Sequence, residues 1–367
     1  MPTLLPVFKL ETPTGPYRVG TANYTWTDPA RKGADGKERA INVQIWYPAD
    51  SSGREAKYIS NFNAFAKAMD KEYGVPGLLL NYFNLVRTHT YEGAPFASGL
   101  RTVPLVFFSH GNMFGTRFTS LFQTAELASH GYVVAAVEHP GTALMSAFPD
   151  GSYVGYEGAT SLSEMGYEAE NEATSPIIVE QTLDIEFALA QLKKIGSQGS
   201  DSPVAGKIDF SKLGIIGHSQ GGATAVNVLY ENADFKAAID LDGYLYGKDR
   251  PSAPHQPVLI MNGGKELAGL GDSPEMKNSE EKRRAKVLAR RGYVLDMDEV
   301  WHLSFTDIPL YSPLLGMVNS DPRSIHHAIN TASLHFMDQY LKGGKAFAES
   351  FKSGPGIRLR MVGSELK

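Results

Sequence analysis

Hydrophobic and polar residues alternate near the start of the chain. Residues 17–27 and 40–47 repeat with the period of two that is typical of strands with one exposed face. A glycine-containing stretch at 31–36 separates them and favours a turn. The pattern therefore predicts two antiparallel strands at the start of the fold.

Farther along, apolar residues gather in short uninterrupted runs, which are typical of strands buried on both faces of a parallel sheet. Segments with helical spacing separate these runs. The predicted strands are 103–108, 132–137, 213–216, 235–241, 257–261 and 293–300, and the predicted helices are 118–130, 177–195, 222–230, 274–291 and 324–342. This alternation predicts an α/β fold with a mostly parallel central sheet, helices on both faces and antiparallel N-terminal strands.

Two segments interrupt the alternation. Within 58–100, residues 58–73 have the apolar spacing of a helix, and 75–86 is more apolar than a surface segment needs. We expect a helical insertion near the site entrance, in which 75–86 either packs in the core or forms an interfacial or substrate-facing patch. Residues 142–172 are polar, rich in glycine and aperiodic, which favours a cap or active-site insertion. We expect both insertions to belong to a single domain over residues 1–367.

A predicted strand, a tight turn and a predicted helix follow one another at 213–230, and residues 217–221 read G-x-S-x-G. This arrangement is the nucleophile elbow of α/β-hydrolases, in which a strained turn exposes a serine hydroxyl at the edge of the sheet. Glycines flank the serine because a Cβ there would meet neighbouring backbone. The pattern predicts Ser219 as the nucleophile of an α/β-hydrolase fold, and the competing interpretation is a glycine-rich turn with a passive serine.

A serine hydroxyl needs a base within hydrogen-bond reach, and chain order in this fold is serine, acid, histidine. His302 follows a predicted strand, whereas the other late histidines lie within the predicted helix 324–342. We therefore expect His302 to be the general base. The residues leave the acid open between Asp242, at the end of one strand, and Glu266 or Asp272, after the next strand.

The loop after strand 103–108 supplies one oxyanion N–H in this fold class, and the residue after the serine supplies the other. We expect these donors to be the backbone N–H groups of Gln220 and of Asn112, or of Met113 if the loop is shifted. His110 and His218 flank these positions and are expected to brace the site. Substrate contacts are expected at Met113, Phe114, His139, Phe305 and Leu314.

Composition excludes several other functions. A chain that is 42% apolar and 20% charged is typical of a globular protein, and a net charge of −5 gives no basic footprint for nucleic acid. Cysteine is absent, and His326, His327 and His335 lack a metal-binding spacing such as H-E-x-x-H. We expect neither a metal nor a cofactor.

Targeting signals are weak in this sequence. No apolar run reaches the roughly 18 residues of a membrane span. Residues 1–8 are too short and too interrupted by proline to be the apolar part of a signal peptide. The compartment therefore stays open, either the cytoplasm or a secreted or periplasmic location with a leader removed.

Several motifs occur together along the chain. They are FFSHG at 107–111, LASHGYVVAAVEH at 127–139, GHSQGGAT at 217–224, LDG at 241–243 and HLSFTD at 302–307. In combination they resemble the plasma-type platelet-activating factor acetylhydrolases, and the resemblance covers most of the chain. It implies a calcium-independent, lipase-like serine esterase, with the acid at Asp242 and the oxyanion residues at Asn112 and Gln220.

These observations predict a carboxylic-ester hydrolase that works through Ser219, His302, Asp242 and an acyl-serine intermediate. Expected substrates are short- or medium-acyl esters, including phospholipids that are oxidised or resemble platelet-activating factor, with transient contact to a lipid interface. A general or polyester-type, cutinase-like esterase would use the same residues in a more open cleft. The alternative from another class is a catalytically silent binding module on a hydrolase scaffold.

Overall fold

The computed structural model describes residues 7–33, 36–158, 166–197, 201–265, 274–312 and 321–363. Its centre is a run of mutually parallel strands, as the apolar runs predict. They are β5 (Val103–Ser109), β6 (Val133–Glu138), β9 (Ile208–His218), β10 (Phe235–Leu241), β11 (Val258–Lys265) and β12 (Gly292–Trp301).

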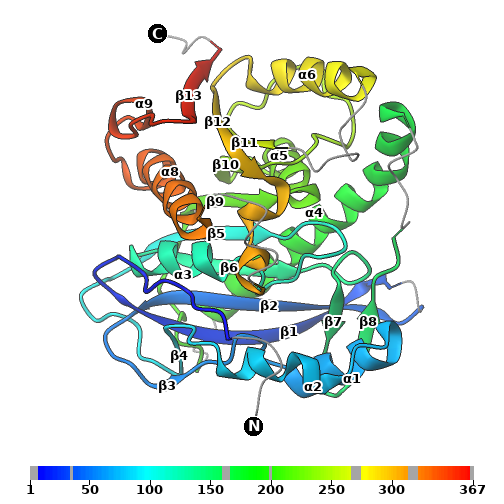
Figure 1. Cartoon of the computed structure of the whole chain (residues 1–367). Helices are drawn as coiled ribbons and strands as arrows, with labels where there is room; N and C mark the ends of the chain where they lie inside the picture. The colour runs from blue at the N-terminus through cyan, green and yellow to red at the C-terminus, as the bar shows by residue number, and fades with distance from the viewer. Residues whose placement is uncertain are drawn as a thin grey trace.

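Shorter or antiparallel strands extend this centre on both sides. They are β1 (Arg18–Lys32), β2 (Glu38–Ala49), β3 (Arg54–Glu55), β4 (Thr90–Glu92) and β13 (Ile357–Val362). The whole sheet has the order β13-β12-β11-β10-β9-β5-β6-β2-β1-β4-β3, and it runs through the full height of the molecule in Figure 1. The antiparallel pair predicted at the N-terminus is confirmed as β1 and β2.

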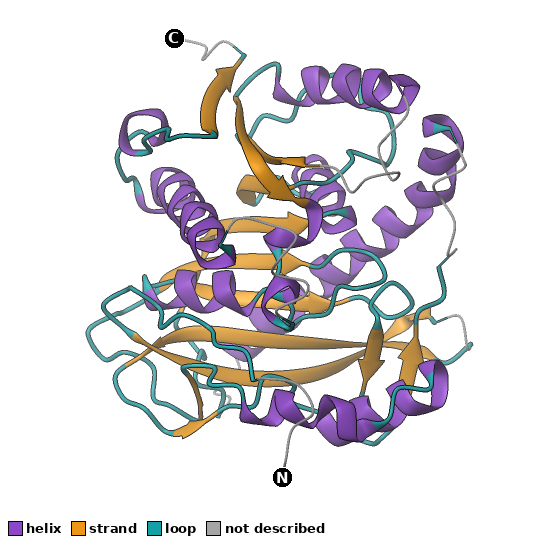
Figure 2. Cartoon of the chain, in the orientation of Figure 1, coloured by secondary structure: helices purple, strands orange, loops and turns teal. Residues whose placement is uncertain are grey.

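Helices cover both faces of the sheet (Figure 2). The larger ones are α3 (Leu121–Ser129), α4 (Tyr167–Ser197), α5 (Gln220–Glu231), α6 (Pro274–Leu288) and α8 (Pro322–Lys342). A further helix of similar length is α1 (Phe62–Tyr73). Short elements are α2 (Gly77–Leu80), α9 (Phe347–Ser350) and the 3-10 turns η1 (Asn81–Leu85), η2 (His302–Phe305) and η3 (Ile308–Leu310). In the described part of the chain, no helix is long and apolar enough to span a bilayer.

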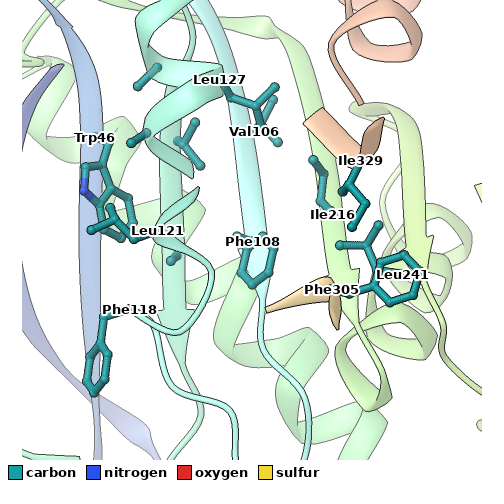
Figure 3. Close-up of a cluster of buried hydrophobic side chains, with 14 of the residues drawn as sticks. Trp46, Val106, Phe108, Phe118, Leu121, Leu127, Ile216, Leu241, Phe305 and Ile329 are labelled. Atoms are coloured by element: carbon teal, nitrogen blue, oxygen red, sulfur yellow. The ribbon is translucent and has the colours of Figure 1, made fainter. Parts of the chain in front are cut away.

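Alternate residues of the central strands enter two separate cores, because successive side chains point to opposite faces. Val106 and Phe108 pack with α3 and α8 in one core, part of which Figure 3 shows. Leu105 and Phe107 pack with α4 and α5 in the other. With both faces covered, polar chemistry is left to the strand ends.

The 142–172 segment departs from the sequence expectation of an aperiodic stretch. It contains a two-stranded sheet, β7 (Met145–Ala147) with β8 (Tyr153–Gly155), that contacts α1, and its last residues already belong to α4. The helix predicted from residue 177 starts earlier and keeps Pro176 in its interior. Before this proline, the Asn171 side chain accepts a hydrogen bond from the Gly247 N–H at 2.8 Å, which ties the first turns of α4 to the loop after β10.

The apolar stretch at 75–86 lies partly in the core and partly at the surface. Tyr82 and Phe83 are buried, whereas Leu78 and Leu85 are 56% and 53% exposed. One side of α2 and η1 therefore anchors this insertion in the core, and the other leaves apolar side chains at the surface.

Candidate active site

Ser219 lies on a strained turn between β9 and α5. Its φ of 56° and ψ of −124° are rarely adopted by L-residues. A Cβ on Gly217 would lie 1.8 Å from the carbonyl oxygen of Gly221, and one on Gly221 would lie 2.2 Å from that of Ser109. The two glycines of the motif are therefore required by backbone packing, as the sequence predicts for a nucleophile elbow.

Asp242 follows β10, and its Oδ2 lies 2.8 Å from Nδ1 of His302. The Gly263 N–H donates to Oδ1 at 2.7 Å. Burial by itself would raise the pKa of Asp242, but the hydrogen bond and charge of His302 hold it below its ordinary value. An ionised Asp242 thus faces His302, while Glu266 and Asp272 lie outside the described residues.

His302 begins η2 at the end of β12, its Nδ1 contacts Asp242, and its side chain is 45% exposed. Ser219 and His302 line the same two cavities. Among the described residues, no hydrogen bond joins the Ser219 hydroxyl to the His302 ring. Such contacts are often long before substrate binds and tighten in the reacting complex.

The His218 side chain holds the backbone of His302 in place. Its Nε2 lies 3.0 Å from the His302 carbonyl oxygen, so Nε2 carries the hydrogen and donates it. Burial, together with the nearby His302, lowers the pKa of His218 to about 3, so the ring is neutral. This arrangement agrees with the expected bracing role.

The two predicted oxyanion segments meet beside Ser219. Gln220 begins α5, where backbone N–H groups have no partner within the helix and attract negative charge. In the loop after β5, the Met113 N–H already donates to the Thr142 carbonyl at 2.8 Å, which leaves Asn112 as the better candidate. A Cβ on Gly111 would lie 3.0 Å from the Ser219 Cβ, so only glycine lets this loop approach so closely.

Two cavities meet at Ser219 and His302. The larger, of about 630 Å³, carries charged and aromatic side chains, and the smaller, of about 270 Å³, has more apolar walls. The larger is lined in part by Tyr244, Tyr246, Lys265, Lys277, Glu281, Arg284 and Trp301, and the smaller by Met113, Phe114, Tyr156, Leu303 and Ile308. An ester bound at Ser219 would therefore place its two halves in unlike surroundings.

Only some of the expected substrate-contact residues line a cavity in the structure. Met113 and Phe114 line the smaller cavity. His139 and Phe305 are fully buried, which corrects the expectation that they touch substrate. His139 is held by Ser109 and Asp184, and Phe305 packs in the core of Figure 3. Leu314 lies outside the described residues.

Sequence reasoning missed most of the residues that line the two cavities, and Leu303 and Tyr156 are two examples from the smaller one. Leu303 directly follows His302, and that proximity is a usable signal. Tyr156 belongs to the 142–172 segment, and its hydroxyl accepts a hydrogen bond from the Asn112 side chain at 3.1 Å. No local pattern connects Tyr156 with the oxyanion loop. Within the described ranges, no cluster of three or more acidic or histidine side chains could hold a metal ion.

The fold and the site together define a serine ester hydrolase of the α/β-hydrolase class. The profile of the family described as platelet-activating factor acetylhydrolase, isoform II, matches residues 5–353. The chain belongs to this family, so the resemblance seen in the motifs is confirmed.

Known proteins agree with this assignment. A platelet-activating factor acetylhydrolase of Cavia porcellus is 28% identical over 373 residues, covering 91% of this chain and 78% of the relative. That of Bos taurus is 27% identical, covering 92% and 79%. A solved ferulic acid esterase from Streptomyces cinnamoneus superposes with a TM-score of 0.75 at 24% identity, covering 96% of this chain and 99% of that one, which confirms the fold.

Proposed function

We propose that this chain hydrolyses carboxylic esters through Ser219, with His302 as general base and Asp242 as the acid that orients it. The observation that carries the proposal is the 2.8 Å contact between Asp242 Oδ2 and His302 Nδ1 beside the strained Ser219. An ionised Asp242 keeps the hydrogen of His302 on Nδ1, so Nε2 can take a proton.

In the first half of the reaction, Ser219 Oγ attacks the ester carbonyl carbon and its proton moves to His302 Nε2. The Asn112 and Gln220 N–H groups stabilise the negative carbonyl oxygen. His302 then gives the proton to the departing alcohol, which leaves an acyl-serine. In the second half, water attacks the carbonyl carbon of the acyl-serine, again with His302 as base, and the carboxylic acid product is released. Asp242 stabilises the imidazolium in both halves.

The two cavities favour an ester with unlike halves. The smaller cavity suits a short or medium acyl chain, because Met113, Leu303 and Ile308 line it. The larger cavity suits a polar alcohol, because Lys265 and Arg284 line it. A phospholipid with a short acyl chain, similar to platelet-activating factor or to an oxidised phospholipid, matches both halves, and the names of the curated relatives support this class.

A general or polyester-type esterase is the second candidate. The larger cavity also holds Trp301 and the rings of Tyr244 and Tyr246, whose centroids lie 5.7 Å apart. These aromatic walls would suit an aromatic ester unit, and the similar fold of a ferulic acid esterase adds to this reading.

One experiment tests the proposed nucleophile, and a second ranks the substrates. A fluorophosphonate should label the wild type and leave Ser219→Ala unlabelled, whereas equal labelling would remove the proposed nucleophile and favour a silent binding module.

The substrate series compares p-nitrophenyl esters with a short-acyl phospholipid presented as monomers or as vesicles. Turnover of the p-nitrophenyl esters should fall as the acyl chain becomes longer. Preference for the phospholipid, greatest on vesicles if Leu78 and Leu85 contact lipid, supports the first candidate. Preference for aromatic esters supports the second.

A further inference from the structure

A second serine–histidine–aspartate arrangement lies in the interior, formed by Ser109, His139 and Asp184. Ser109 Oγ lies 3.0 Å from His139 Nε2, and His139 Nδ1 lies 2.9 Å from Asp184 Oδ2. All three residues have 0% exposure. We call them the buried set. Because no substrate can reach this serine, the geometry must serve another purpose.

The acid of the buried set is ionised. Arg39 donates from Nε to Asp184 Oδ1 and from Nη2 to Oδ2, both at 2.7 Å, and Arg31 donates to Oδ1 at 2.9 Å. Burial alone would raise the pKa of Asp184, but the hydrogen bonds from Arg39 and His139 hold it well below its ordinary value. The carboxylate therefore fixes the hydrogen of His139 on Nδ1 and leaves Nε2 to accept from Ser109.

The backbone of His139 connects the buried set to the oxyanion loop. Its N–H donates to His110 Nε2 at 2.9 Å, and its carbonyl accepts from the Thr142 N–H at 3.2 Å. The carbonyl of Thr142 in turn accepts from the Met113 N–H. The position of His139 thus controls two hydrogen bonds that reach the loop from β6.

The ring of His110 joins the His139 backbone to the peptide group between Gly111 and Asn112. Its Nδ1 lies 2.8 Å from the Gly111 carbonyl oxygen, and because a carbonyl only accepts, Nδ1 is the donor. A single hydrogen on Nδ1 agrees with the acceptor role of Nε2 toward His139. Burial, with a contribution from His139, lowers the pKa of His110 to about 3 and keeps this one tautomer neutral.

The Gly111 carbonyl and the Asn112 N–H belong to the same planar trans peptide, in which they point in opposite directions. Fixing the carbonyl therefore fixes the direction of the N–H. A Cβ at Gly115 would lie 2.2 Å from the Gly111 carbonyl oxygen and 2.9 Å from His110 Nδ1, so the chain also packs tightly against this peptide. Both the hydrogen bond and the packing oppose its rotation.

We propose that the buried set is a positioning device which, through His110, aims the Asn112 N–H at the oxyanion. The proposal rests on the function proposed above, in which Ser219 is the nucleophile and Asn112 donates to the oxyanion. His110, His139, Ser109 and Asp184 are positioning residues, since none of them touches the substrate.

Two substitutions of similar size separate the bonds of His110. His110→Asn places an amide N–H near the former Nδ1 and retains the donor to Gly111, whereas His110→Gln retains only a group near Nε2. We expect His110→Gln to lower kcat on the order of 100-fold with KM nearly unchanged, and His110→Asn to recover about tenfold of that loss. Affinity for a trifluoromethyl ketone, which forms an oxyanion on Ser219, should fall in step with kcat.

His139→Leu tests the buried set itself, with Gln123→Leu as the matched control. Gln123 is also fully buried, and it donates to Ser333 at 2.8 Å between α3 and α8, away from the oxyanion loop. Both variants should lose thermal stability, but only His139→Leu should lose kcat and trifluoromethyl ketone affinity, by about tenfold or more.

The outcomes are distinguishable from failure of the proposed function. If Ser219→Ala keeps its activity, the proposed mechanism fails. If Ser219→Ala is inactive, the positioning proposal is overturned by equal losses in the two His110 variants or by a kcat for His139→Leu that matches Gln123→Leu. Should His139→Leu not fold, the His110 pair alone decides.

Discussion

The chain contains two serine–histidine–aspartate sets that share a histidine–aspartate contact of nearly the same length, although of these two described sets only the buried set also has its serine hydrogen-bonded to the histidine. Histidine Nδ1 lies 2.8 Å from the carboxylate in the proposed catalytic set of Ser219, His302 and Asp242, and 2.9 Å in the buried set. The sets differ in access, because the His302 side chain is 45% exposed and that of His139 is not exposed. Hydrogen-bond distances alone therefore do not identify a catalytic site.

The backbone at the two serines also differs. Ser219 sits at positive φ on an elbow beside a helix N-terminus, whereas Ser109 is the last residue of a regular strand. The elbow projects its hydroxyl into the cavities and places N–H groups beside it. The strand turns the other hydroxyl into the interior, where it serves as a hydrogen-bond donor to His139.

The surroundings of the two acids explain their different roles. Asp184 is neutralised in place by Arg39 and Arg31, so its charge is already balanced. Asp242 draws its stabilisation mainly from His302 and from the Gly263 N–H. The charge of Asp242 is therefore available to stabilise an imidazolium as it forms.

Exchanging each serine for alanine should produce the largest contrast. Ser219→Ala should lower kcat on the order of 10⁵-fold or more, because it removes the nucleophile. Ser109→Ala should lower kcat by less than about tenfold, because the His139–Asp184 bond still holds the loop. Steady-state kinetics and fluorophosphonate labelling measure both. Loss of labelling in a folded Ser109→Ala variant would show that the sets had been assigned the wrong roles.

Neutralising each acid should separate activity from stability. Asp242→Asn should lower kcat about 10⁴-fold, because the His302 tautomer is no longer enforced, with little change in the melting temperature. Asp184→Asn should destabilise the fold by about 3–5 kcal/mol, because Arg39 and Arg31 lose a buried partner. Denaturant unfolding beside kinetics gives both values. A more stable Asp184→Asn would mean that the buried arginines find other partners.

The sequence predicted the central strands of the sheet and the elbow at Ser219, and it proposed His302 as the base, because elbow spacing and chain order are local or ordered signals. Asp242 needed the family resemblance, since the residues alone left three acids open. The sequence put His139 in contact with substrate, but its ring turns into the interior. That turn depends on Asp184, which lies on α4 far along the chain, and pairing at this distance leaves no local pattern.

The same limit explains other differences. Phe305 stands in an apolar run after His302, which is compatible with a pocket wall or with core, and the packing around it decides for the core. The early start of α4 depends on contacts with Gly247 and α6, and β13 forms by pairing with β12. In each case a distant partner fixes what the local sequence leaves open.

The smallest expected difference between the two sets lies in how their aspartates make stability depend on pH. The pKa of Asp184 is lowered in the folded protein, so its stabilising contribution is present above the ordinary pKa of 3.8 and is lost as pH falls through the lower, folded value. The stability gap between wild type and Asp184→Asn should therefore stay constant down to about pH 5 and narrow from there to about pH 2. Asp242→Asn should show the same sign but a smaller change, because the Asp242 side chain is 18% exposed and its charge is partly screened. Melting temperatures across this range measure both gaps. A gap for Asp184→Asn that stays constant with pH would mean that its ion pairs with the arginines add no net stability, and that the buried set is held in place by packing alone.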